Sequence, residues 1–219
     1  MRQLLLFASV LCLPLLGQLP GFPIPIEAAV ETLEKTPIFG TTVVSTTGLV
    51  GQIYFVANDT GQLPNFKKLK PKGTIYTTRL NIPPRSFTEG FPGLTDRFEW
   101  FAIQYTARFW VAKAGRYEFA LLSDDGSKLH IDGKEVIDND GQHPPRVEWG
   151  TAKLSEGAHR IQVSYFQGPR TTIALVLAVA KPHQFWRIFD TNEFLPPPEK
   201  FDEWTAAGVA DEAARKKKN

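Results

Sequence analysis

Cysteine is almost absent from this chain of 219 residues. The only one, Cys12, lies inside an apolar run near the N-terminus, and Leu11 stands where lipid attachment would require a small residue. If that run is removed as a signal peptide, the remaining chain contains no cysteine. Disulfides, thiolate zinc sites and cysteine nucleophiles are then excluded together.

Long apolar segments are also scarce, with one exception at the N-terminus. Residues 4–16 are apolar and follow the short basic start Met1-Arg2. This run has the length of a signal peptide's apolar region and is shorter than the ~20 residues of a membrane span. We predict a signal peptide over residues 1–17, no integral membrane span, and a secreted, periplasmic or cell-surface location. An uncleaved hydrophobic anchor is the alternative.

The chain has no strong excess of charge and no recognisable catalytic motif. Its 25 Lys and Arg against 23 Asp and Glu give a net charge of only +2, which does not support a nucleic-acid-binding surface. No glycosidase-like carboxylate pair, Ser-His-Asp order, phosphate-binding glycine loop or zinc-binding helix motif is evident. We therefore predict that the protein is not an enzyme.

Strand and turn signals dominate what is present. The 17 Pro, 17 Gly and 16 Phe favour strands and turns over helices. Apolar residues alternate in several segments, for example over residues 161–165 and 173–179, so that one face of each strand is buried. About eight to ten short strands predict an all-β fold, an antiparallel β-sandwich or barrel, over residues 48–180. Trp100, Trp110 and Tyr165 are expected to fill its core.

The segments around this domain differ from it in composition. Residues 18–47 are rich in Pro and Thr and are predicted to be a linker or lead-in. Residues 181–198 contain several aromatic residues and are expected to pack on the domain as an extension. Residues 199–219 are charged and helix-capable, and a flexible tail is predicted there.

Acidic residues gather between residues 116 and 143. The polar turn Ser123-Asp124-Asp125-Gly126 separates two alternating strands, and Asp132-Gly133 is typical of a tight hairpin. We expect five acidic residues on the loops of one small antiparallel unit, where strands would hold their carboxylates as a cation site: Asp124, Asp125, Asp132, Asp138 and Asp140. In the alternative interpretation Asp124 only accepts backbone amides in a turn, with Gly126 at positive φ.

Several of these motifs occur together in a known family. Gly115, the Asp-Asp-Gly turn, the Leu-x-Ile-Asp-Gly hairpin ending at Gly133 and the Gly-x-His strand start at Gly157 are present in that order. Together they resemble the fourteen-kilodalton domain first described in anthrax protective antigen, which also occurs in yeast flocculins, related adhesins and some bacterial glycosidases. The resemblance covers about three fifths of the chain. It implies a β-sandwich that is widely used as a carbohydrate-binding module.

The resemblance also implies a ligand site. In the adhesin branch, two consecutive aspartates joined by a cis peptide bind calcium, and the calcium holds sugar hydroxyls; here these would be Asp124 and Asp125. The adhesins complete the site with an asparagine on a loop where this chain has Gln167. Asn139 and Asp140 are alternative donors. Calcium is therefore a conditional cofactor.

Other residues are candidate ligand contacts. Arg170 is predicted either to hydrogen-bond a ligand or to be a solvated loop residue, and Trp149 either to stack on a sugar ring or to pack at an edge. Four lysines between residues 58 and 72 indicate either an anionic-ligand loop or a solvated one. The leading hypothesis is an exported module that binds a glycan or polysaccharide. The alternative is a metal-free module that binds a protein partner or serves as an envelope scaffold.

Overall fold

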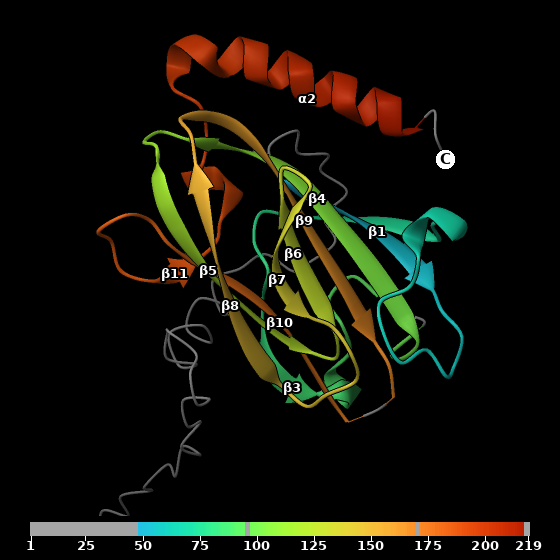
Figure 1. Cartoon of the computed structure of the whole chain (residues 1–219). Coiled ribbons are helices and arrows are strands. Elements are labelled where there is room, and N and C mark those ends of the chain that lie inside the picture. Colours follow the sequence, from blue (N-terminus) through green and yellow to red (C-terminus); the bar gives the residue numbers. More distant parts are fainter. Residues whose placement is uncertain (1–47, 95–96, 170, 217–219) are drawn as a thin grey trace, which may run out of the picture.

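The computed structural model describes residues 48–94, 97–169 and 171–216, and the side chains up to residue 208. The predicted signal peptide over residues 1–17, the lead-in over residues 18–47 and Arg170 lie outside the described residues. Two antiparallel sheets pack face to face, and the C-terminal helix lies across one end of them (Figure 1).

The first sheet has six strands in the order β2-β1-β4-β9-β6-β7. In that order the strands are Gly73–Thr77, Leu49–Phe55, Phe101–Val111, Gly157–Gln167, Ser127–Ile131 and Lys134–Asn139. The second sheet has the order β11-β10-β5-β8, and β3 also pairs with β10. Its strands are Arg187–Ile188, Thr172–Ala180, Gly115–Asp124, Arg146–Leu154 and, for β3, Asn81–Ser86.

This arrangement confirms the predicted all-β, antiparallel class and decides between its two forms. Within the described residues neither sheet closes on itself, so the fold is a sandwich and not a barrel. Four short 3-10 helices, Phe66–Lys68, Phe87–Glu89, Thr191–Glu193 and Pro198–Lys200, connect the strands or precede the helix α2, Phe201–Lys216.

The core lies between the sheets and follows the predicted alternation. Alternate residues of β9 and β10, such as Val163 and Leu175, are fully buried. Tyr165 is in the core as predicted, but Trp100 and Trp110 are only half-buried. For Trp110 the reason is strand phase, because Phe109 of β4 points inward and its neighbour Trp110 must then point outward. Trp100 precedes β4 and has a positive φ of 59°.

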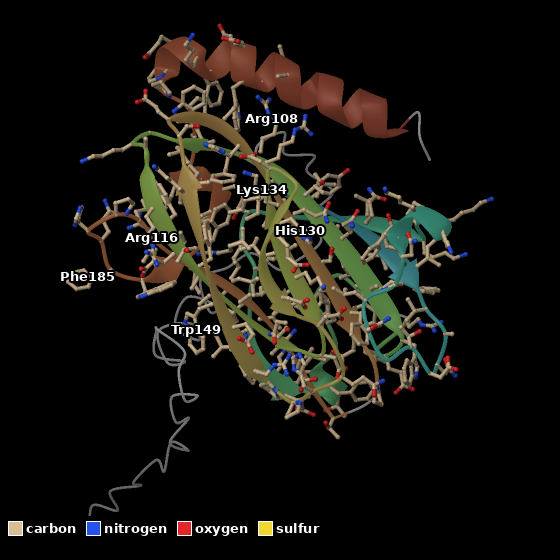
Figure 2. All side chains as sticks on the ribbon, in the orientation of Figure 1. Arg108, Arg116, His130, Lys134, Trp149 and Phe185 are labelled. Carbon is tan, nitrogen blue, oxygen red and sulfur yellow. The ribbon has the colours of Figure 1, made fainter. Side chains whose placement is uncertain are left out.

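The segment after β10 packs on the sandwich through two rings. Phe189 and Phe194 are buried and stack with their ring centroids 4.9 Å apart, while Phe185 is 94% exposed (Figure 2). Within the segment predicted as a flexible tail, residues 199–219, the structure has the helix α2, whose Trp204 is only 3% exposed. Arg108 lies over the Trp204 ring at 4.2 Å from its centroid and donates a hydrogen bond of 2.9 Å to its carbonyl oxygen.

The acidic segment does not form one small antiparallel unit, so that prediction was wrong. Strand β5 pairs with β8 and β10 in one sheet, whereas β6 pairs with β7 and β9 in the other. The predicted hairpin between β6 and β7 is confirmed, since Asp132 and Gly133 both have positive φ, at 51° and 78°. The Asp124-Asp125-Gly126 turn therefore carries the chain from one sheet to the other.

Gly150 marks a close approach between the two sheets, where β7 passes beside β8. A Cβ atom at Gly150 would overlap the carbonyl oxygen of Val136 and lie 2.7 Å from the Ile137 side chain. We expect Gly150→Ala to lower the free energy of unfolding by about 2–3 kcal/mol, because the overlap can be relieved only by moving backbone. Urea denaturation measures this change.

Gly61→Ala is the matched control, since a Cβ there meets nothing within 4 Å and Gly61 lacks a positive φ. It should leave the free energy of unfolding within about 0.5 kcal/mol of the parent value. Equal stability of the two variants would show that β7 and β8 do not approach as described.

Candidate functional site

The predicted Asp-Asp turn lies at the end of the sandwich opposite α2, toward the bottom of Figure 1. Asp124 is the last residue of β5, and Ser127 opens β6 in the other sheet. A Cβ on Gly126 would lie 2.5 Å from the Phe166 ring and 2.8 Å from Asp140 Oδ1. Glycine is needed here for close approach and not for positive φ, which corrects the turn geometry considered from sequence.

Asp125 is held firmly by the two neighbouring loops. It is 5% exposed, and its carboxylate accepts hydrogen bonds from the backbone N–H groups of Gly168, at 2.8 Å, and His143, at 3.2 Å. Burial raises the pKa of Asp125, and these two backbone donors oppose that rise. The side chain therefore ties the loop after β7 and the loop after β9 to the sheet-crossing turn.

Asp124 has the opposite environment. It is also 5% exposed, yet in the described part of the chain no group donates a hydrogen bond to its carboxylate. Burial, together with the neighbouring charge of Asp125, raises the pKa of Asp124 to about 7. The peptide bond between the two aspartates is cis, as the family resemblance implies. Among the described residues no backbone amide donates to the Asp124 carboxylate, so the turn cap considered from sequence is not found there.

Gln167 and Tyr165 lie directly behind the two aspartates and are fully buried. The Tyr165 hydroxyl is 2.5 Å from Gln167 Oε1 and 2.7 Å from the Asp124 carbonyl oxygen. Gln167 Nε2 lies 3.4 Å from Asp125 Oδ2 and 3.3 Å from the Thr172 carbonyl oxygen. A tyrosine has one hydroxyl hydrogen, so it can serve only one of its two acceptors at a time.

Rotating the Gln167 amide by 180° would remove this conflict. Tyr165 would then donate to the Asp124 carbonyl oxygen and accept from the Gln167 amide nitrogen. The Gln167 oxygen would face the Asp125 carboxylate and the Thr172 carbonyl oxygen. That second arrangement places several oxygens together and is favourable only when a cation lies among them.

Asn139, predicted as a possible ligand donor, is used within the fold. It is fully buried, and its amide nitrogen donates to Ser123 Oγ and to the Arg146 carbonyl oxygen, each at 3.0 Å. Its oxygen accepts from Arg146 Nε at 2.8 Å. Both hydrogens of the amide are therefore occupied in holding the start of β8 against β5.

Asp140 lies beside the turn but faces the loop between β1 and β2. Its Oδ1 accepts from the backbone N–H groups of Leu63 and Gly141, each at 2.8 Å. Next to it, Gln142 Nε2 donates to the Thr60 carbonyl oxygen at 3.1 Å. These contacts were not predicted, because the sequence gives no signal that residues 60–63 lie against residues 140–142.

Trp149 is not brought to the Asp-Asp turn. It is 48% exposed on β8 and pairs with Ala120, four residues before Asp124 on β5 (Figure 2). At about 3.3 Å per residue this separation is about 13 Å, too far for one sugar ring to contact both.

The remaining acidic residues are dispersed, so the predicted five-carboxylate cluster was wrong. Asp138 pairs with Lys128 at 2.7 Å, and Asp132 contacts His159 Nδ1 at 2.6 Å at the far end of the sandwich. Over the residues that the structure describes, no three His, Cys, Asp or Glu side chains gather closely enough to hold a metal ion.

His159 also lies near Ser155, in an arrangement that superficially suggests a catalytic triad. Its Nε2 is 3.0 Å from the Ser155 carbonyl oxygen and 3.4 Å from the Ser155 hydroxyl. The nearer contact is with a carbonyl oxygen, which leaves this nitrogen unsuited to take a proton from the hydroxyl. The three residues fix the turn between β8 and β9.

A family model described as the PA14 domain matches residues 47–184. The chain belongs to the PA14 domain family. This confirms the resemblance to the protective-antigen domain, and the matched range is close to the predicted domain over residues 48–180. No curated protein matches the chain.

Solved structures agree with the PA14 fold. The PA14 domain of the MpAFP antifreeze protein has a TM-score of 0.55 at 19% identity over 70% of this chain and 93% of that one. A PA14 sugar-binding domain from an RTX adhesin has a TM-score of 0.54 at 17% identity, and the alignment covers 66% of this chain and 96% of the adhesin domain. An anti-sigma factor domain-containing protein from Clostridium clariflavum has a TM-score of 0.54 at 20% identity. The alignment covers 68% of this chain but only 47%, about half, of the length of that protein. At these identities the likeness shows the fold.

No helix in the described ranges has the length and apolar character that crossing a membrane requires.

The carboxylate of Asp124, which has no hydrogen-bond donor among the described residues, predicts an unusual dependence of stability on pH. The folded protein retains a proton on Asp124 up to about pH 7, whereas the unfolded chain releases it near the ordinary pKa of 3.8. In a chelator, the contribution of this group to the free energy of unfolding should therefore fall as the pH rises from about 4 to about 7. Asp124→Asn should remove that fall and raise the free energy of unfolding at pH 8 by about 2–4 kcal/mol, the upper end being the full shift at ~1.4 kcal/mol per pKa unit.

Asp138→Asn provides a control of opposite sign. The hydrogen bond from Lys128 lowers the pKa of Asp138, so this variant should be slightly less stable than the parent at pH 8. Thermal unfolding of the three proteins between pH 4 and 8 measures both effects. A loss of stability in Asp124→Asn at pH 8 in chelator would contradict the described environment of Asp124.

Proposed function

We propose that this PA14 domain is an exported carbohydrate-binding module, in which Asp124 and Asp125 hold a calcium ion. The observation that carries the proposal is the buried carboxylate of Asp124, which lacks a hydrogen-bond donor in the described part of the chain and lies next to a second buried carboxylate. A buried carboxylate without a partner either stays protonated or requires a cation. The adhesin domain of the same fold that is described as sugar-binding supports the choice of ligand.

The residues present fit calcium in their chemistry. Calcium takes oxygen ligands from carboxylates, amides and carbonyls in a flexible geometry. Asp124 and Asp125 would supply carboxylate oxygens, and Gln167 would supply its amide oxygen after the rotation described above. Tyr165 favours that rotation because it then both donates and accepts one hydrogen bond. When bound, calcium would supply a positive centre for sugar hydroxyl oxygens.

The number of charged ligands at the site indicates how tightly it should bind calcium. Only two carboxylates are present, and Asp125 already accepts two backbone hydrogen bonds. Affinity for calcium rises with the number of charged ligands, and extracellular modules typically have dissociation constants of about 10⁻⁴–10⁻³ M. We therefore place this site in the weak range, suited to an environment where calcium is abundant.

Export belongs to the same proposal and rests on the apolar run over residues 4–16. The proposed contacts of Arg170 and Trp149 with the ligand also belong here. Because of its distance from Asp124, Trp149 would contact only a glycan of several sugar units.

Calorimetric titration with calcium tests the metal site. The parent should show saturable binding, and a folded Asp124→Asn/Asp125→Asn double variant should show none. Gln167→Glu tests whether the Gln167 side chain contacts the ion, because it replaces a neutral oxygen ligand by a charged one of the same size. If Gln167 contacts the ion, this variant should bind calcium at least tenfold more tightly.

Asp138→Asn is the matched control for charge, since the Asp138 carboxylate is exposed, pairs with Lys128 and accepts from the Asp140 N–H, with no contact to Asp124 or Asp125 in the described part of the chain. It should bind calcium as the parent does. Absence of binding in a folded parent protein, or equal binding in the double variant, would overturn the metal assignment.

A glycan array with and without a chelator tests the carbohydrate ligand. We expect the parent to bind at least one class of glycan in calcium, and to lose at least nine tenths of that signal in the chelator and in the Asp124→Asn/Asp125→Asn variant. If no glycan is bound while a protein partner is retained on the folded protein, the scaffold alternative replaces the carbohydrate proposal.

A further inference from the structure

A second concave surface lies on the outer face of the six-stranded sheet, away from the Asp-Asp turn. Strand register places Gln52, Gln104, Ser164 and Lys128 in one row across four adjacent strands. A second row contains Thr106, Gln162 and His130. Because side chains alternate along strands, both rows point away from the core. Together they form the floor of a groove of about 770 Å³, a volume typical of ligand sites.

The floor of this groove contains polar groups without partners. In the described part of the chain, the amides of Gln104 and Gln162 make no hydrogen bond, although both side chains are half-buried. Ser164 is only 4% exposed, and its hydroxyl likewise has no partner among these residues. These side chains face the groove, where a ligand or water can complete their hydrogen bonds. Among the groove-lining atoms that the structure describes, His130 Nδ1 is buried and has no hydrogen-bond partner, which also indicates a ligand or water there.

The wall of the groove is apolar and comes from the loop between β1 and β2. The ring of Phe66 packs edge-on against Tyr54 with centroids 5.1 Å apart, and Leu63 and Pro64 continue the wall. The Asp140–Leu63 hydrogen bond, 2.8 Å long, holds this loop in place. The groove thus combines an amide and hydroxyl floor with an aromatic and aliphatic wall.

Charge on the floor is nearly balanced. The Lys128 ammonium is paired with Asp138 at 2.7 Å and Glu135 at 3.2 Å, which raises the pKa of Lys128 and neutralises its charge locally. Lys67 is the other lysine that lines the groove. This balance favours an uncharged ligand over a strongly anionic one.

We propose that this groove binds a neutral oligosaccharide without calcium. Sugars present hydroxyl groups on their rim and C–H groups on their faces, which match the amides and hydroxyls of the floor and the rings of the wall. The assignment extends the proposed carbohydrate function to a second site. It does not depend on the metal site, because the groove contains neither Asp124 nor Asp125. His130 on β6 and Trp149 on β8 mark the two separate sheets in Figure 2.

The test is nuclear magnetic resonance of the ¹⁵N-labelled protein in a chelator, with the side-chain amide signals of Gln52, Gln104 and Gln162 as reporters. The probes are neutral hexasaccharides of glucose, mannose, galactose, xylose and N-acetylglucosamine. We expect at least one probe to shift these signals in a saturable manner. A Gln104→Leu/Gln162→Leu variant should bind that probe at least tenfold more weakly, as judged from the Gln52 amide and backbone signals.

Two further variants keep the outcome decisive. Ser164→Ala should weaken binding with little disturbance to the sheet, so a misfolded double variant would not end the test. Asp124→Asn/Asp125→Asn should leave these shifts unchanged even if it abolishes calcium-dependent binding, which separates this site from the proposed metal site.

The groove assignment is overturned if no neutral hexasaccharide shifts the three amides. It is equally overturned if the shifts persist unchanged in both groove variants. Binding of a polyuronate hexasaccharide alone, lost in Lys67→Gln, would show an anionic-ligand groove instead. Binding of a peptide alone would show a protein-interaction surface.

Discussion

The chain changes sheets at Asp125-Gly126, and the room available at that crossing constrains much of the remaining structure. Gly126 passes so close to Phe166 and Asp140 that no side chain fits there. With the crossing fixed, β5 and β6 enter different sheets with defined registers. The same crossing places Asp124 and Asp125 side by side under the loops that follow β7 and β9. The position of the candidate site therefore follows from the point where the chain crosses from β5 in one sheet to β6 in the other.

The two aspartates illustrate how position within a turn sets chemistry. Asp125 meets two backbone N–H groups, which stabilise its charge, while Asp124, its direct neighbour, meets none in the described part of the chain. Burial is the same for both, so the difference in hydrogen bonding decides that Asp124 is the carboxyl more in need of an external positive charge. Beside them, the single hydroxyl hydrogen of Tyr165 faces two acceptors, Gln167 Oε1 and the backbone carbonyl oxygen of Asp124.

The sequence predicted the parts that depend on local pattern. Alternation identified the inward faces of β9 and β10, and Asp132-Gly133 identified the tight hairpin. It failed where a long-range contact decides. The approach of residues 60–63 to Asp140 and the burial of Trp204 leave no periodic signal in the sequence. Asn139 was predicted as an alternative ligand donor from its residue type, and its hydrogen bonds to β5 and β8 depend on strand placement and could not be predicted.

The hydrogen bonds from Leu63 to Asp140 and from Gln142 to Thr60 give one loop two neighbours. On one side this loop forms the wall of the groove, and on the other it rests on residues adjoining the Asp-Asp turn. Two ligands that each change the same loop on binding are linked thermodynamically, and such linkage is reciprocal. If filling the turn alters affinity at the groove by some factor, filling the groove must alter affinity at the turn by the same factor. Binding of one long polymer at the Asp-Asp turn and at the groove would then be cooperative within a single domain.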